Sequence, residues 1–157
     1  MRFRRRAEPA RPRGGVAEAP IWVLDTNVLV SGLLSPSGPP GRLVDGLLAR
    51  RLRIALDDRL EIEYRDVLAR PKLRIESVRR GAFLAILQFQ DHLTALPWPH
   101  RMPPDEDDVV FLEVALQTSA RVVVTGNLKH FPAGCRGPVT VLSPRSAWER
   151  FVGLETG

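Results

Sequence analysis

The sequence predicts a single α/β domain, a three-layer α/β/α sandwich with a central, mostly parallel sheet. Three observations predict this fold class. Short apolar runs recur along the chain, as expected for strands that are buried on both faces of a sheet. Helical patterns of about ten or more residues separate these runs, which is typical of βαβ units. The length of 157 residues fits one domain.

The strands are predicted from their apolar runs. The run at residues 21–24 is the first, and the run at 121–125 is the clearest because it holds three consecutive valines. The remaining predicted strands are 53–56, 139–142 and a short edge strand at 94–96.

The helices are predicted from apolar spacings of three and four residues. Asp58 and Glu61 have the spacing of a capping box, and Pro71 ends the helix that they begin. Ser143 as N-cap and Pro144 at the first helical position begin the last helix. The other predicted helices follow residues 38–41, span 75–93 and run from about 107 to 116.

The net charge of +5 is concentrated in one segment. Residues 1–19 hold six of the 23 basic residues but only two of the 18 acidic ones. The segment 1–20 is rich in Arg, Pro, Gly and Ala, so it is predicted to be a disordered basic tail. It is either a solvated extension or an arm that contacts nucleic-acid phosphates. The folded domain is predicted over 21–152, with a C-terminal tail at 153–157.

The composition excludes several classes of protein. The longest apolar runs are far shorter than the roughly 20 residues of a membrane span, so no membrane association is expected. Cys135 is the single cysteine, which excludes a disulfide scaffold and argues against a structural zinc site. The tail lacks the apolar segment of a secretory signal, and a cytoplasmic location is expected.

Small polar residues follow two of the predicted strands. Asp25, Thr26 and Asn27 come directly after the first strand, and Thr125 and Asn127 follow the valine-rich strand. Ligands of open α/β sheets bind at the carboxyl ends of the strands. We therefore expect the chemistry of the protein to be located at these two turns.

Helices supply further carboxylates. Asp108 lies on the apolar face of its helix, where it either binds a partner or merely favours the helix dipole. Glu63 and Glu61 lie on opposite borders of the apolar face of an earlier helix, so helical geometry does not choose between them. If Asp25, Glu63 and Asp108 converge, their mutual repulsion calls for a hard divalent cation, Mg²⁺ or Mn²⁺. Such a pocket favours hydrolysis of phosphodiesters.

Four stretches of the sequence resemble those of a known family in their order and spacing, namely residues 23–31, 63–72, 105–115 and 123–131. The chain resembles the PIN-domain (PilT N-terminus) family, and within it the bacterial toxins of toxin–antitoxin pairs. The resemblance covers about residues 21–152. It implies a metal-dependent endoribonuclease that acts on single-stranded or looped RNA, leaving 5′-phosphate and 3′-hydroxyl ends.

The resemblance also implies roles for individual residues. Asp25, Glu63 and Asp108 would be the catalytic residues and the ligands of Mg²⁺ or Mn²⁺, with Asp107 replacing Asp108 if the register is off by one. Asn127 falls where many members have a fourth aspartate. The resemblance further implies that Asn27, Thr125 and Asn127 line the pocket, that Lys129 meets a substrate phosphate, and that an antitoxin protein and a second copy of the chain are partners.

Two other functions stay open at this point. A haloacid-dehalogenase-like phosphatase would need a second aspartate two positions after Asp25, where this chain has Asn27. A PIN-like module that only binds RNA or protein is the other alternative, because Asn127 replaces an acid. The histidines, including His130, are interpreted as structural or exposed, and Arg79 and Arg80 as an exposed helix face.

Overall fold

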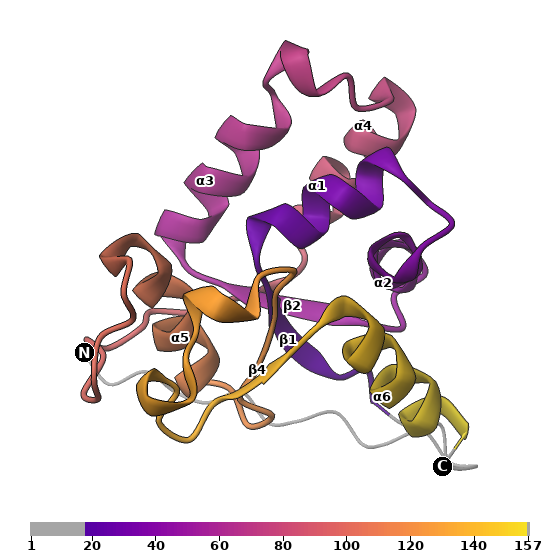
Figure 1. The fold of residues 1–157 in the computed structure, drawn as a ribbon. Helices are drawn as coiled ribbons and strands as arrows, with labels where there is room; N and C mark the ends of the chain where they lie inside the picture. The colour runs from indigo at the N-terminus through magenta and orange to yellow at the C-terminus, as the bar shows by residue number, and fades with distance from the viewer. Residues whose placement is uncertain (1–17, 157) are drawn as a thin grey trace, which may run out of the picture.

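The computed structural model describes residues 18–156, in which helices lie on both sides of a five-stranded sheet (Figure 1). The strands are β1 (Ile21–Leu24), β2 (Arg53–Leu56), β3 (Asp91–His92), β4 (Val122–Val124) and β5 (Thr140–Leu142). Their spatial order is β3-β2-β1-β4-β5, and every neighbouring pair is parallel. The predicted α/β/α sandwich with a parallel sheet is therefore confirmed.

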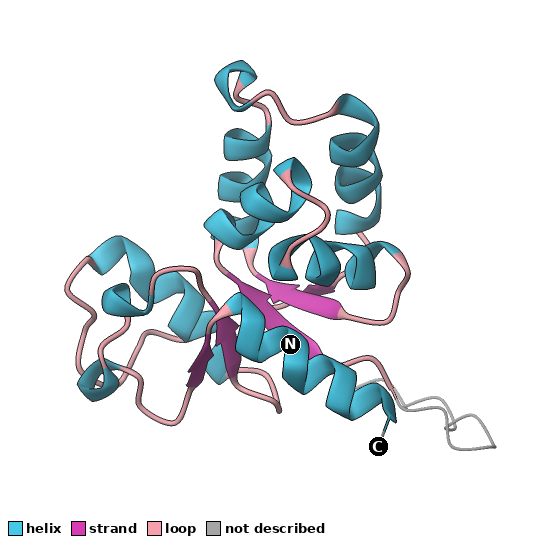
Figure 2. Cartoon of the chain, turned by 45° about the vertical axis from the view of Figure 1, so that its right-hand side comes forward, coloured by secondary structure: helices cyan, strands magenta, loops and turns pink. Residues whose placement is uncertain are grey.

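Residues 18–156 form six α-helices. They are α1 (Thr26–Leu34), α2 (Pro39–Leu48), α3 (Asp58–Leu68), α4 (Ser77–Leu87), α5 (Val109–Leu116) and α6 (Pro144–Thr156). Helix α5 packs on β1, β2 and β4, whereas α2 packs against α1, α4 and α6. Figure 2 shows the strands between these groups of helices. The central strands are buried on both faces, which explains their continuous apolar runs.

The centre of the sheet determines where the polar turns lie. In the register of β1 and β4, Val23 pairs with Val123 and Leu24 pairs with Val124. The two strands therefore end at the same level, and Asp25 N donates a hydrogen bond to Val124 O at 2.8 Å. The turns that follow β1 and β4 lie side by side as a result.

Some predicted boundaries are wrong. The edge strand is β3 at Asp91–His92 rather than at 94–96, and α4 spans Ser77–Leu87 rather than 75–93. Helix α1 was not predicted, because its apolar residues do not form a single stripe. A turn of 3-10 helix, η2 (Glu106–Asp108), precedes α5, which begins two residues later than expected.

The ends of the helices and of the chain also differ from expectation. The N-cap of α3 is Asp57, whose carboxylate accepts from Leu60 N at 3.0 Å, so the capping assignment of Asp58 is off by one. Helix α6 continues through residues 153–156, which were assigned to a C-terminal tail. The predictions for the Arg-rich segment 1–17 lie outside the described residues.

Arg79 is a structural residue rather than part of an exposed face. Its side chain is 15% exposed and forms an ion pair with Asp45 at 2.9 Å. Its guanidinium also donates to the carbonyl oxygens of Gly32 and Gly41, at 3.1 and 3.3 Å. A Cβ atom on Gly32 would collide with the backbone of Pro40 in α2, and one on Gly41 with the backbone of Pro36 in the loop before α2, so glycine is required at both positions. Arg79 thereby joins α4 to α1 and α2.

Within residues 18–156, no helix is long and apolar enough to cross a membrane.

Candidate active site

Asp25 is fixed in place at the carboxyl end of β1. It is the N-cap of α1 and is 6% exposed. Its Oδ2 accepts a hydrogen bond from Thr125 Oγ1 at 2.8 Å, and its Oδ1 accepts from the backbone N–H of Asn27 at 3.3 Å. Thr125 is fully buried at the end of β4, so this contact joins the two polar turns. The carboxylate is oriented before any ligand binds.

Glu63 reaches the same end of the sheet from α3. Its Oε2 accepts a hydrogen bond from Oγ1 of Thr26, the residue that follows Asp25. The next residue, Tyr64, is fully buried and donates from its hydroxyl to Leu24 O at 2.6 Å. Tyr64 thus fastens α3 to the last residue of β1, which brings Glu63 to the beginning of α1.

Asp108 approaches this region from the turn that precedes α5. It ends η2, its side chain is 14% exposed, and its Oδ2 lies 3.1 Å from His130 Nδ1. His130 ends the 3-10 turn η3 (Leu128–His130), which follows β4. The contact has ion-pair distance but lacks hydrogen-bond geometry, and Oδ2 is buried with no other partner among the described residues. The interpretation of His130 as merely structural or exposed therefore missed a contact of the site.

The electrostatics link Asp108 to Asp25. Burial raises the pKa of the Asp108 carboxyl, and the negative charges of Asp105, Asp25 and Asp107 raise it further. The positive charge of a protonated His130 acts in the opposite direction. A half-buried carboxylate close to other carboxylates is costly unless a cation compensates it.

The alternatives Glu61 and Asp107, and the neighbouring Asp105, lie in other surroundings. Glu61 forms an ion pair with Arg65 at 2.9 Å and lies 3.5 Å from His92. Asp105 caps η2 by accepting from the backbone N–H of Asp107 at 2.9 Å, and both residues are exposed. These contacts are typical of a helix surface and of a solvated cap.

The expected pocket-lining residues lie around the two turns. Thr125 Oγ1 donates to Asp25 and also accepts from Asn127 N at 3.0 Å. The side chains of Asn27 and Asn127 are exposed, as is Lys129. They are therefore accessible to a ligand that approaches the carboxyl ends of β1 and β4.

The donors present fit a hard divalent cation. In residues 18–156, no three His, Cys, Asp or Glu side chains are close enough to hold a metal ion as they stand. However, the carboxylate of Asp108 accepts no hydrogen bond from the described residues, and it senses the charge of Asp25. Carboxylate oxygens are the ligands that Mg²⁺ and Mn²⁺ prefer. A cation between these residues would remove the repulsion that the buried oxygen experiences.

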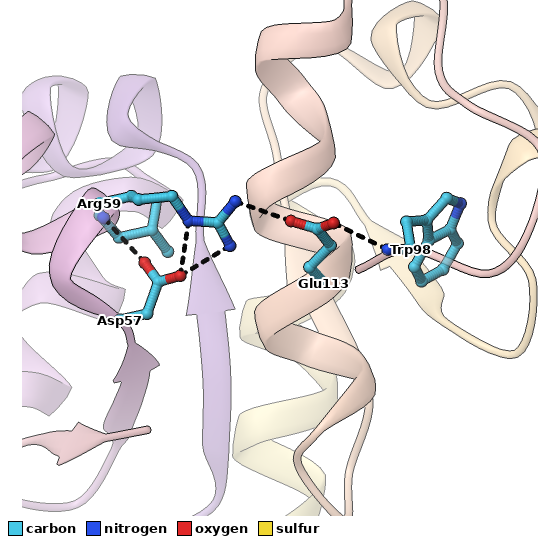
Figure 3. Close-up of polar contacts among 5 residues, drawn as sticks. Asp57, Arg59, Trp98 and Glu113 are labelled. Atoms are coloured by element: carbon cyan, nitrogen blue, oxygen red, sulfur yellow. Dashed lines mark hydrogen bonds and ion pairs between the residues drawn. The ribbon is translucent and has the colours of Figure 1, made fainter. Parts of the chain in front are cut away.

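A second polar network was missed by sequence reasoning (Figure 3). Glu113 is 7% exposed in the middle of the otherwise apolar α5. Its carboxylate accepts from Arg59 at 2.8 Å and from Trp98 N at 2.8 Å, while Arg59 also contacts Asp57 at 2.7 Å. The isolated glutamate in the sequence VVFLEVAL was the signal for it. All its charges are paired within the network, so its role is to join α3, α5 and the segment before α5.

The comparisons with known proteins agree with this geometry. A family model described as PIN domain matches residues 22–129. The chain belongs to the PIN domain family. An uncharacterized protein of Methanocaldococcus jannaschii is 29% identical over 108 residues, which cover 67% of this chain and 69% of that protein. No solved structure gives a significant match.

Membership of the PIN domain family determines the broad type of activity. PIN domains are generally nucleases that act on nucleic acid, and they generally use divalent metal ions. The phosphatase alternative is therefore set aside, because that chemistry belongs to a different family. The matched region contains α3, α5, β4 and all of β1 except Ile21, and thus all the carboxylates described above.

Proposed function

We propose that this PIN domain is a divalent-metal-dependent endoribonuclease that hydrolyses phosphodiester bonds of single-stranded or looped RNA. The catalytic residues are Asp25, Glu63 and Asp108. The single observation that carries this proposal is the hydrogen bond from Thr125 to Asp25, which fixes the Asp25 carboxylate between the ends of β1 and β4. Glu63 is bonded to Thr26, the next residue, and the charge of Asp25 acts on Asp108.

The three carboxylates would hold Mg²⁺ or Mn²⁺. When bound, such a cation polarises a phosphodiester and lowers the pKa of water, so that water becomes a nucleophile. Asp25 contributes a rigid carboxylate, since two hydrogen bonds hold its oxygens. Glu63 is oriented by Thr26, and α3 is held against β1 by Tyr64. The chain thus supplies preorganised negative charge without a large rearrangement of the backbone.

The exposed polar residues of the two turns would meet the substrate. Lys129 lies in η3, two residues after Asn127, and its ammonium group is free to contact a phosphate oxygen. Asn27 and Asn127 provide amide groups that can donate to phosphate or sugar oxygens. A strand of RNA that crosses the carboxyl ends of β1 and β4 would pass all three residues.

The biological role that we propose is that of a toxin in a type II toxin–antitoxin pair. It rests on the resemblance of the four stretches described above. A small antitoxin protein would then cover the acidic site, and a second copy of the chain would form a homodimer. A gene for a small protein directly beside this one, whose product suppresses cleavage, would support the role.

A second candidate function is an RNA- or protein-binding module with weak catalysis. The observation that favours it is Asn127, a neutral amide at the end of β4 in a position where an acid would add a ligand. Such a module would bind RNA without cleaving it at a useful rate.

A cleavage assay tests the proposal. Labelled single-stranded RNA is incubated with the wild type and Asp25→Asn, each with Mn²⁺ or with excess chelator. The proposal expects cleavage only by the wild type with Mn²⁺. RNA binding without cleavage under all conditions would instead favour the binding module, and equal cleavage by Asp25→Asn would show that the site is wrongly assigned.

A further inference from the structure

His130 occupies a particular place relative to the carboxylates. It lies three residues after Asn127, and its imidazole reaches η2 on a separate part of the chain. The side chain is 44% exposed, so part of the ring faces solvent while Nδ1 faces Asp108. No other residue in the described part of the chain contacts the Asp108 carboxylate at hydrogen-bond or ion-pair distance.

The two oxygens of Asp108 have different surroundings. Oδ2 is inaccessible to solvent and faces His130 Nδ1 at 3.1 Å. Oδ1 also accepts no hydrogen bond from the described residues, but unlike Oδ2 it is not fully buried. Oδ1 is therefore the oxygen that remains accessible to a ligand. A carboxylate divided in this way resembles the arrangement in which one oxygen binds a metal and the other is held by the protein.

The contact needs only a small adjustment to become a hydrogen bond. The atoms are already at a normal donor–acceptor distance, and the contact lacks only the angles of a hydrogen bond. Contacts of this kind are often poorly aligned in free proteins and improve when the ligand binds. His130 ends a 3-10 turn, so rotation of its side chain does not require a change in β4.

We propose that His130 is a positioning residue that holds Oδ2 of Asp108 and thereby presents Oδ1 to the divalent cation. This inference rests on the proposed function, because it presupposes that Asp108 is a ligand. The imidazole donates from Nδ1 to Oδ2 and does not itself contact the cation. His130 thereby restricts the orientation of the Asp108 carboxylate before the cation binds, so that less conformational entropy is lost on binding.

The test is Mn²⁺ binding by calorimetry with variants that separate the N–H donor from the volume of the side chain. His130→Leu keeps most of the volume without a donor, and His130→Ala is a second variant without a donor. His130→Asn restores an N–H on the atom that corresponds to Nδ1. His92→Ala is the matched control, since His92 also lies near a glutamate, Glu61, that is not a proposed ligand.

We expect His130→Leu and His130→Ala to bind Mn²⁺ about tenfold more weakly than the wild type, a size typical of lost contacts to a metal ligand. His130→Asn should recover most of the affinity, and His92→Ala should bind normally. Thermal unfolding of each variant identifies any that are unfolded at the assay temperature. If one donor-free variant is unfolded, the other is compared with His130→Asn.

Three results would overturn the inference. Equal affinity of the wild type and both donor-free variants would show that His130 does not position Asp108. Tighter binding by those variants would show that His130 competes with the cation. A wild type that binds no Mn²⁺ would overturn the proposed metal dependence as well, so failure of the site and failure of the role of His130 are distinguishable.

Discussion

Thr125 Oγ1 donates a hydrogen bond of 2.8 Å to Asp25 Oδ2 and joins two residues that are 100 positions apart in the sequence. The bond is possible because β1 and β4 are neighbours that end at the same level. It fixes the carboxylate at the centre of the sheet, where both Glu63 and Asp108 approach.

Asp108 and Asp107 provide a matched pair of variants. Asp108→Asn should weaken Mn²⁺ binding by about tenfold or more, about 1.4 kcal/mol, because it removes a half-buried carboxylate that senses Asp25. Asp107→Asn should leave the affinity nearly unchanged, since Asp107 is exposed. Calorimetry at one ionic strength measures both. The reverse order of effects would show that the register of η2 is shifted by one residue.

Glu63 and Glu61 provide a second pair. Glu63→Gln should reduce the rate of RNA cleavage at least about tenfold, because the amide retains the size of the side chain but not its charge. Glu61→Gln should change only the surface ion pair with Arg65, which contributes about 0.5 kcal/mol. Initial cleavage rates with saturating Mn²⁺ distinguish the two. Similar losses in both variants would argue against Glu63 as the specific ligand.

Asn127→Asp tests whether the end of β4 belongs to the metal site. The added carboxylate should tighten Mn²⁺ binding by about tenfold at low salt, because the backbone N–H of Asn127 donates to Thr125 Oγ1, which donates to Asp25 and keeps residue 127 beside that carboxylate. Gln117→Glu is the control, since it adds the same charge at the exposed C-cap of α5. Unchanged affinity in Asn127→Asp, or an equal gain in both variants, would remove Asn127 from the site.

The single tyrosine reports on the junction of α3 and β1. Burial raises the pKa of Tyr64 well above 10, and the charges of Asp25, Glu63 and Asp57 act in the same direction. Since the unfolded chain releases this proton near pH 10 and the folded chain retains it, stability should fall as the pH rises above about 10. Below that pH, Tyr64 should add no pH dependence.

Ultraviolet titration of tyrosinate checks this expectation, because the chain has no other tyrosine. The folded protein should ionise only together with unfolding, whereas the protein in denaturant should titrate near pH 10. A titration near pH 10 with unchanged circular dichroism would mean that Tyr64 is not buried against Leu24.

Much of the fold was predictable from the sequence because its central strands are buried on both faces. Strand β4 consists of three consecutive valines, a continuous apolar run that is typical of a strand buried on both faces. By contrast, β3 consists of Asp91 and His92, which have no apolar signal, and is held by backbone bonds such as Leu93 N to Leu56 O. Helix α1 is a short segment whose apolar residues form two runs, 28–30 and 33–34, for which periodicity does not separate helix from strand.

The candidate site was predictable only where it follows strands. Asp25 and Thr125 were found because ligands bind at the carboxyl ends of parallel strands. Helical geometry alone did not separate Glu63 from Glu61, and Glu63 was favoured only by the resemblance; the contacts of Thr26 and Tyr64 that bring Glu63 to α1 depend on how α3 packs. His130 could not be found from spacing, because its partner Asp108 lies on another element and the two meet only through tertiary structure.

The most direct test of the central claim is Mn²⁺ binding by calorimetry, with the wild type and Asp25→Asn measured in parallel. Asp66→Asn serves as the control, because Asp66 is a surface aspartate on α3 whose side chain is 68% exposed. We predict that the wild type and Asp66→Asn bind Mn²⁺ alike and that folded Asp25→Asn loses the binding. A folded wild type that binds no Mn²⁺, or an Asp25→Asn variant that binds it as tightly, would contradict the claim that these carboxylates form a metal site.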